Sequence, residues 1–91
     1  MLIDVTRDDI RKGRRVQVGL CPVALAVKRA VPEAEAVWVS GEDITVRWPR
    51  HRWTTVRAPR VVAKFVPTYD LYPHCWPFVR PFSFDLPLAI E

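Results

Sequence analysis

A long alternation of apolar and polar residues between Ala36 and Arg57 constrains the fold of this chain more than any other feature. Apolar side chains recur at every second position, which is the period of a strand with one buried face. Two segments rich in turn-forming residues, SGED and PRHR, interrupt the alternation. The pattern therefore predicts three antiparallel strands joined by two hairpins.

The first hairpin turn is predicted at Gly41 and Glu42, because a two-residue turn with glycine in first position is common between antiparallel strands. In that register Ser40 lies opposite Asp43. The pairs that follow are Val39 with Ile44, Trp38 with Thr45, and Val37 with Val46.

For the second hairpin we expect a four-residue loop over 49–52, which places Trp48 opposite Trp53 as a cross-strand aromatic pair. Alternation then assigns each side chain to one face of the sheet. The face predicted to cover the core carries Val37, Val39, Ile44, Val46, Trp48 and Trp53. The opposite face carries Trp38, Thr45, Arg47, Thr54 and Val56.

The N-terminal part of the chain predicts one strand and two helices. Residues 2–5 alternate as a short strand, and Thr6 with Asp9 forms a relative of the capping box at the start of a short helix. Gly13 is expected to end this helix in the left-handed conformation. A second helix is predicted from Pro22 to Val31, between two prolines and with apolar residues at helical spacing.

The C-terminal part predicts one more helix and one more strand. An amphipathic helical segment follows Ala58 and is expected to end at Pro67. Residues 67–81 are rich in proline and aromatic residues and are predicted to form an ordered loop. The segment FSFDL alternates as a half-buried strand that could return beside the N-terminal strand, and residues 88–91 are expected to form a frayed tail.

These elements predict one α+β domain over residues 1–91. Its centre is an antiparallel meander extended by terminal strands, with two or three short helices against one face. A chain of 91 residues has room for only one compact core.

Charge and hydropathy restrict the classes of partner. The net charge is +4 and the isoelectric point is near 9.6, which suits attraction to nucleic acid or to an acidic protein and disfavours mimicry of DNA. No apolar run approaches the roughly 18 residues of a membrane span, and the N-terminus lacks a basic segment followed by an apolar stretch. We therefore expect a cytoplasmic protein that binds no membrane. The sequence does not predict an oligomeric state.

No group of residues predicts catalysis, a cofactor or a metal site. Structural zinc sites take paired ligands two to four residues apart, whereas His74 and Cys75 are adjacent. Cys21, at a helix N-terminus, is the better of the two cysteines for a lowered pKa, but no base is marked for it. A non-enzymatic protein is the first hypothesis, and a small thiol enzyme using Cys21 or Cys75 is the third.

Aromatic residues and arginines supply the candidate binding residues. Trp, Tyr and Arg are the types enriched at the hot spots of protein interfaces, which favours binding of another protein. The alternative is nucleic-acid binding by the arginine-rich hairpin loop, with arginines on phosphates and an exposed aromatic ring on a base. The candidates are Trp38, Arg47, Arg50, His51, Arg52, Tyr69, Tyr72 and Trp76.

Three segments, IDVTRDDIRKG, CPVALAVKRAV and FVRPFSFDLP, follow one another in an order that resembles small accessory proteins of bacteriophages and prophages. The resemblance spans most of the chain, and its motifs are capping, packing and strand residues. It implies action in the cytoplasm of a bacterial host. It also implies an accessory or anti-defence role, including inhibition of a CRISPR system by binding.

Overall fold

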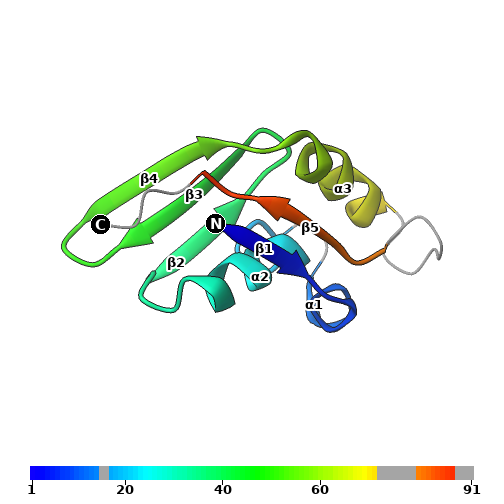
Figure 1. Ribbon diagram of the computed structural model, residues 1–91, viewed down its shortest axis with the longest axis horizontal. Helices are drawn as coiled ribbons and strands as arrows, with labels where there is room; N and C mark the ends of the chain where they lie inside the picture. Colours follow the sequence, from blue (N-terminus) through cyan, green and yellow to red (C-terminus); the bar gives the residue numbers. More distant parts are fainter. Residues whose placement is uncertain (15–16, 72–79, 88–91) are drawn as a thin grey trace.

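The central meander forms as predicted. Strands β2 (Ala36–Val39), β3 (Asp43–Trp48) and β4 (Arg52–Arg57) make an antiparallel sheet in the order β2-β3-β4 (Figure 1). The structure is a computed structural model and describes residues 1–14, 17–71 and 80–87. Within these ranges the chain is a small α+β domain with two antiparallel sheets.

The terminal strands form a second sheet of their own. Strand β1 (Leu2–Val5) pairs antiparallel with β5 (Phe82–Asp85), with Ile3 opposite Phe84. The return of the last strand beside the first is confirmed, but the two strands do not extend the meander. One reason lies at the edge of β2 that faces away from β3. There the Val39 amide already donates to the Val18 carbonyl at 2.9 Å.

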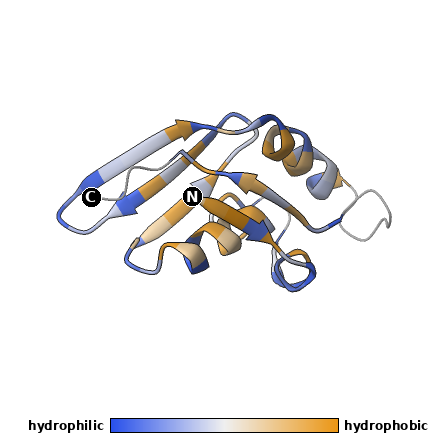
Figure 2. Ribbon diagram, in the orientation of Figure 1, coloured by the Kyte–Doolittle hydropathy of each residue, from blue (hydrophilic) through white to orange (hydrophobic). Residues whose placement is uncertain are grey.

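In the part of the chain that the structure describes, three helices pack with these strands: α1 (Arg7–Lys12), α2 (Pro22–Ala30) and α3 (Arg60–Leu71). Helix α2 packs against β2 and β1, and α1 packs against α2, so α2 joins the two sheets. Figure 2 shows α2 and β2 largely hydrophobic, while β4 is pale over much of its length, with one hydrophobic segment near its arrowhead and hydrophilic ends. The residues with the least exposure are Ile3, Val5, Val23, Val27, Val31, Val39, Ile44, Val46, Val62 and Leu86.

The predicted capping box of α1 is confirmed. The Thr6 hydroxyl accepts from the Asp9 amide at 3.1 Å, and the Asp9 carboxylate accepts from the Thr6 amide at 2.8 Å. The prediction for Gly13 was right about the helix end but wrong about its conformation, because φ is −64° and ψ is 158°. Glycine is needed here because an added Cβ would lie 2.6 Å from Cδ of Pro22.

The predicted register of the first hairpin is confirmed, with Val39 opposite Ile44 and the Ser40 amide bonded to the Asp43 carbonyl at 2.9 Å. The two-residue turn at Gly41 and Glu42 is confirmed with it, and Gly41 does not take a positive φ. The Ser40 hydroxyl accepts from the amides of Glu42 and Asp43 at 3.1 and 3.0 Å. A side-chain hydroxyl therefore helps to close the turn.

The predicted register of the second hairpin is wrong by one residue. Its loop has three residues, 49–51, so that Trp48 lies opposite Arg52 and Arg47 lies opposite Trp53. The shorter loop is possible because Arg50 and His51 both take positive φ values, 66° and 59°, which tighten the reversal of the chain.

This one-residue difference exchanges the two faces of β4. Trp48 lies in the core as predicted, 9% exposed, and its indole nitrogen donates to the Thr54 hydroxyl at 2.9 Å. Trp53 is instead 57% exposed and lies on the opposite face of the sheet. The predicted Trp48–Trp53 pair does not form.

Helix α3 continues through Pro67 to Leu71, where the sequence predicted a loop. Proline removes the N–H that would donate to the Ala63 carbonyl. The Thr68 hydroxyl makes a further bond to the neighbouring carbonyl of Lys64 at 2.9 Å. Phe65 stacks on Tyr69 one turn further along, with ring centroids 5.7 Å apart. This packing outweighs the local preference of proline. Of the predicted 67–81 loop, residues 72–79 lie outside the described residues, as does the predicted tail over 88–91.

Candidate functional site

Two tryptophans stack on the solvent side of the meander. Trp38 on β2 and Trp53 on β4 have ring centroids 5.3 Å apart and an interplanar angle of 16°. The two rings therefore meet across the central strand β3. We call this side of the sheet the outer face, and by strand alternation it carries Trp38, Thr45, Arg47, Trp53, Thr55 and Arg57.

Arg47 supports the exposed ring. Its guanidinium carbon lies 5.8 Å from the centroid of the Trp53 ring, a cation–π distance, and its Nε lies 3.5 Å from a carboxylate oxygen of Glu35. Beside the stack the hydroxyls of Thr45 and Thr55 lie 3.1 Å apart. Trp53 is thus held by two neighbouring side chains while most of its surface remains accessible.

The β2 end of the stack is covered by the chain before α2. An added Cβ on Gly19 would lie 3.8 Å from Cδ1 of Trp38, so the Gly19 backbone passes close to this ring. Trp38 is accordingly half-buried, and Trp53 is the exposed member of the pair.

The arginine-rich loop lies next to the exposed tryptophan. Arg50 and His51 form the tip of the second hairpin, Arg52 begins β4, and all three are exposed. Trp53 follows directly in the chain. The hairpin therefore places three exposed basic residues next to the exposed tryptophan in sequence, although by strand alternation Arg52 and Trp53 point to opposite faces of the sheet.

The predicted site residues divide into three groups. Trp38, Arg47, Arg50, His51 and Arg52 come together on the outer face and its adjoining hairpin tip. Tyr69 does not belong to this surface. Tyr72 and Trp76 lie outside the described residues.

Tyr69 is a core residue rather than an interface residue. It is only 3% exposed, and its hydroxyl lies 3.1 and 2.7 Å from the carbonyl oxygens of Ile10 and Gly13. Burial raises the pKa of this phenol. Tyr69 therefore joins α3 to the end of α1, and the prediction that it anchors a partner is withdrawn.

Trp53 is the site residue that sequence reasoning missed, because a four-residue loop assigned it to the core. An exposed Trp53 would have followed from a shorter hairpin loop. A loop of three residues instead of four places Trp53 on the opposite face of the sheet, and no other sequence signal pointed to this.

Cys21 is a buried thiol at the start of α2. Its sulfur accepts from the Ala24 amide at 3.5 Å, as an N-cap does. Burial nevertheless raises the pKa of the thiol, outweighing the backbone hydrogen bonds that lower it. A pocket of about 190 Å³ adjoins Cys21, and its lining includes Val39, Val66 and Asp70. A thiol kept protonated by burial is a poor nucleophile.

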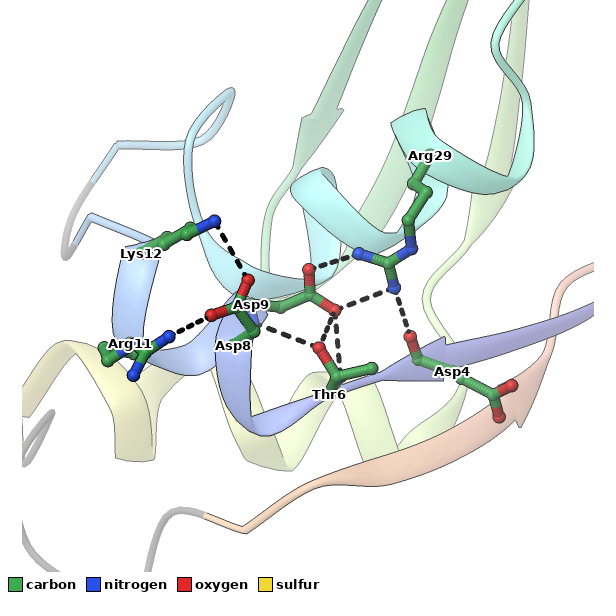
Figure 3. Close-up of polar contacts among 7 residues, drawn as sticks. All are labelled: Asp4, Thr6, Asp8, Asp9, Arg11, Lys12 and Arg29. Carbon is green, nitrogen blue, oxygen red and sulfur yellow. Dashed lines mark hydrogen bonds and ion pairs between the residues drawn. The ribbon is translucent and has the colours of Figure 1, made fainter.

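A polar cluster joins β1, α1 and α2 on the other side of the domain (Figure 3). The Asp9 carboxylate is 4% exposed and receives both terminal nitrogens of Arg29, at 2.5 and 2.9 Å. Burial opposes ionisation of Asp9, but the bonds from Arg29 and Thr6 outweigh it and lower the pKa. Arg29 also donates to the Asp4 carbonyl at 2.9 Å. The sequence analysis did not predict this contact, and its role is structural.

The surface acids of α1 are also paired. Asp8 contacts Arg11, and its other oxygen lies 3.0 Å from Nζ of Lys12. These hydrogen bonds lower the pKa of Asp8, so this carboxylate is not held ready to donate a proton.

The described ranges contain neither a metal-binding cluster nor a membrane-spanning helix. No group of three or more His, Cys, Asp or Glu side chains there could hold a metal ion. His74 and Cys75 lie outside those ranges. Among residues 1–14, 17–71 and 80–87, no helix has the length and apolar character needed to cross a membrane.

Comparison with protein-family models, curated proteins and solved structures finds no match to this chain. The exposed tryptophan pair is therefore interpreted from its own geometry.

Proposed function

We propose that this protein is a non-enzymatic bacteriophage accessory protein that acts by binding a protein of the bacterial host through the outer face. The observation that carries the proposal is Trp53, which is 57% exposed yet held by the Trp38 ring and the Arg47 guanidinium. The resemblance of three sequence segments to phage proteins supports the viral and host-cell part of the proposal.

A held aromatic ring suits protein recognition. Tryptophan and arginine are enriched at interface hot spots, where one ring can contribute ~2 kcal/mol or more. Binding orders side chains, and this cost is smaller where a ring is already fixed by its neighbours. Trp38 and Arg47 fix Trp53 before any partner arrives.

Charge pairing on the outer face favours a protein over nucleic acid. Arg47, the arginine beside the tryptophan pair, is already paired with Glu35. A surface that binds phosphates needs cations whose charge is not already neutralised. The outer face therefore offers an aromatic centre whose neighbouring arginine is already paired.

Nucleic-acid binding is the second candidate function, and the hairpin tip is the observation that favours it. Arg50 and Arg52 lie close in sequence to the exposed Trp53, which combines phosphate contacts with a stacking surface. In that case affinity should fall with salt at a log–log slope of roughly −0.7 to −0.9 per phosphate contacted.

The non-enzymatic part of the proposal is supported by the buried, protonated thiol of Cys21 and the paired acids of α1. An anti-defence role, such as CRISPR inhibition, would act by occupying a host protein. The net charge of +4 supports contact with an acidic protein surface more than imitation of DNA.

The test is capture of partners from nuclease-treated bacterial lysate on immobilised protein. Trp53→Ala is compared with Leu2→Ala, which removes another exposed apolar side chain, 65% exposed, on β1. We expect a host protein that is retained by the wild type and by Leu2→Ala and lost with Trp53→Ala. Equal capture by all three proteins would contradict the proposal.

The rival function has its own measurement. Single-stranded DNA and RNA are titrated at physiological salt against the wild type and against Arg50→Ala, Arg52→Ala combined. Submicromolar binding that this double change weakens, with a flattened salt slope, would replace protein binding by nucleic-acid binding as the leading function.

A further inference from the structure

We infer that the partner binds β4 by strand addition: an extended, acidic segment of another protein pairs with the open edge of β4 as a fourth strand. The inference rests on the proposed function, because it names the partner for the surface around Trp53. It adds the backbone of β4 to the binding surface.

The pattern of hydrogen bonds between β3 and β4 determines which backbone groups of β4 are available to a further strand. The Ala58 amide donates to the Glu42 carbonyl at 2.8 Å, so the even-numbered residues of β4 bond toward β3. In an antiparallel pair the intervening residues direct their N–H and C=O groups away from that neighbour. The residues pointing outward are Trp53, Thr55 and Arg57.

Among residues 1–14, 17–71 and 80–87, nothing is hydrogen-bonded to the β4 edge in the way that Val18 is bonded to the opposite edge. At β2 the Val39 amide is bonded to the chain before α2. Over the described residues, no backbone hydrogen bond involves the outward groups of Trp53, Thr55 or Arg57. Strand β4 also contains no proline or glycine, so a row of donors and acceptors is left open. In Figure 1 β4 forms the outer border of the meander.

The open edge and the exposed ring belong to the same residues. Trp53, Thr55 and Arg57 direct backbone groups to the edge and side chains to the outer face. A residue of an added strand that lies opposite Trp53 would pack directly beside its ring. Main-chain bonds would then supply affinity, and contact with the ring would supply specificity.

Charge identifies the added strand as acidic and as part of another protein. Strand β4 begins with Arg52, ends with Arg57 and has no acid between them. An antiparallel pair of two β4 strands would gather four arginines along one seam, which disfavours a second copy of this chain. An acidic peptide places opposite charges there instead.

The probe is a synthetic seven-residue peptide of alternating glutamate and valine, with a lysine–valine peptide of equal length as its matched control. Amide hydrogen exchange of the isotopically labelled full chain is followed by NMR. In the free protein we expect the amides of Trp53, Thr55 and Arg57 to exchange at least tenfold faster than those of Thr54 and Val56. The acidic peptide should slow the three outward amides at least tenfold, and the basic peptide should not.

A pair of variants tests the backbone bond separately from the side chain. Thr55→Pro removes an outward N–H without removing a bond to β3, whereas Thr55→Val keeps the N–H and loses the hydroxyl. We expect Thr55→Pro to weaken binding of the acidic peptide at least tenfold and Thr55→Val to change it less than threefold. Circular dichroism checks that Thr55→Pro is folded; if it is not, amide exchange of the wild type decides.

Strand addition would be overturned if millimolar acidic peptide did not protect the outward amides, or if the basic peptide protected them equally. It would also be overturned if the protection arose from self-association of this chain, which sedimentation experiments detect, or if nucleic acid alone produced it. The proposed function is tested apart from this. If a captured host protein is lost with Trp53→Ala but kept with folded Thr55→Pro, the outer face binds a protein and strand addition is wrong.

Discussion

Arg29 on α2 holds the buried carboxylate of Asp9 on α1 with two parallel hydrogen bonds, from Nη1 to Oδ1 at 2.5 Å and from Nη2 to Oδ2 at 2.9 Å. This bidentate pair joins two residues that are 20 positions apart in the sequence. Its planar geometry is specific to arginine, so lysine would not replace it.

Asp9→Asn should destabilise the protein by about 2 kcal/mol at pH 7. This is less than the roughly 3 to 5 kcal/mol for breaking a fully buried pair, because the Arg29 side chain is half-exposed. Urea unfolding measures the change. Asp8→Asn is the control, since its ion pairs are exposed, and it should have a clearly smaller effect.

The same pair predicts a pH dependence. The pKa of Asp9 is lowered in the folded protein from its ordinary value of 3.8. The carboxylate therefore stabilises the fold at pH values above 3.8, and this stabilisation is lost as pH falls through the lower folded pKa. Between pH 7 and pH 3 the free energy of unfolding should decline more for the wild type than for Asp9→Asn. Equal declines would show that another group controls acid unfolding.

The two tryptophans of the second hairpin should respond differently to truncation. Trp48→Ala removes a core side chain and should destabilise by about 3 to 5 kcal/mol. Trp53→Ala removes an exposed ring and should cost about 1 kcal/mol, mainly from the lost stack with Trp38. Denaturant unfolding of both variants gives the comparison, and similar losses would favour the predicted four-residue loop over the observed one.

His51→Gly should stabilise the protein by about 0.5 to 1 kcal/mol. His51 has φ 59°, a left-handed conformation that costs an L-residue roughly 1 kcal/mol and glycine little. Thermal unfolding is compared with that of His51→Ala, which keeps the conformational cost. A gain of the same size in His51→Ala would refute the backbone explanation.

Two glycines provide a matched pair for packing. An alanine Cβ at position 13 would lie 2.6 Å from Cδ of Pro22, so Gly13→Ala should destabilise by about 1 to 3 kcal/mol. Gly41→Ala meets nothing within 4 Å, and Gly41 has no positive φ, so this control should change stability by less than about 0.5 kcal/mol. Unfolding of the two variants under one set of conditions gives both values.

Local signals predicted the elements that depend on neighbouring residues. The Thr6–Asp9 capping box and the Ser40–Asp43 register follow from side chains within three positions of each other. The register of the second hairpin is harder to predict from sequence, because the segment WTTV is compatible with either register. A one-residue shift exchanges Thr54 with Thr55, which are chemically identical, and the backbone conformation of Arg50 decides between them.

Contacts between distant segments account for most of what sequence reasoning missed. The extension of α3 through Pro67 depends on Phe65 and its contact with Phe82, at 4.8 Å between ring centroids. Arg29 bonds to Asp9 because α2 packs against α1 and brings the two side chains together. Sequence spacing alone does not predict these partners, so the outer face was found only in part.

The three-residue loop 49–51 makes the chemistry of the protein surface depend on the number of loop residues as well as on their identity. If one residue were inserted there while the loop kept three residues, β4 would shift by one position against β3, turning Trp53 and Thr55 inward and Thr54 and Val56 outward, although every side chain is retained. Substitution scans, which keep the length of the chain, would not detect this determinant. Among related chains, an insertion that shifts β4 in this way would be expected to coincide with loss of the aromatic surface, even where the tryptophan itself is unchanged, whereas an insertion absorbed by a longer loop would not.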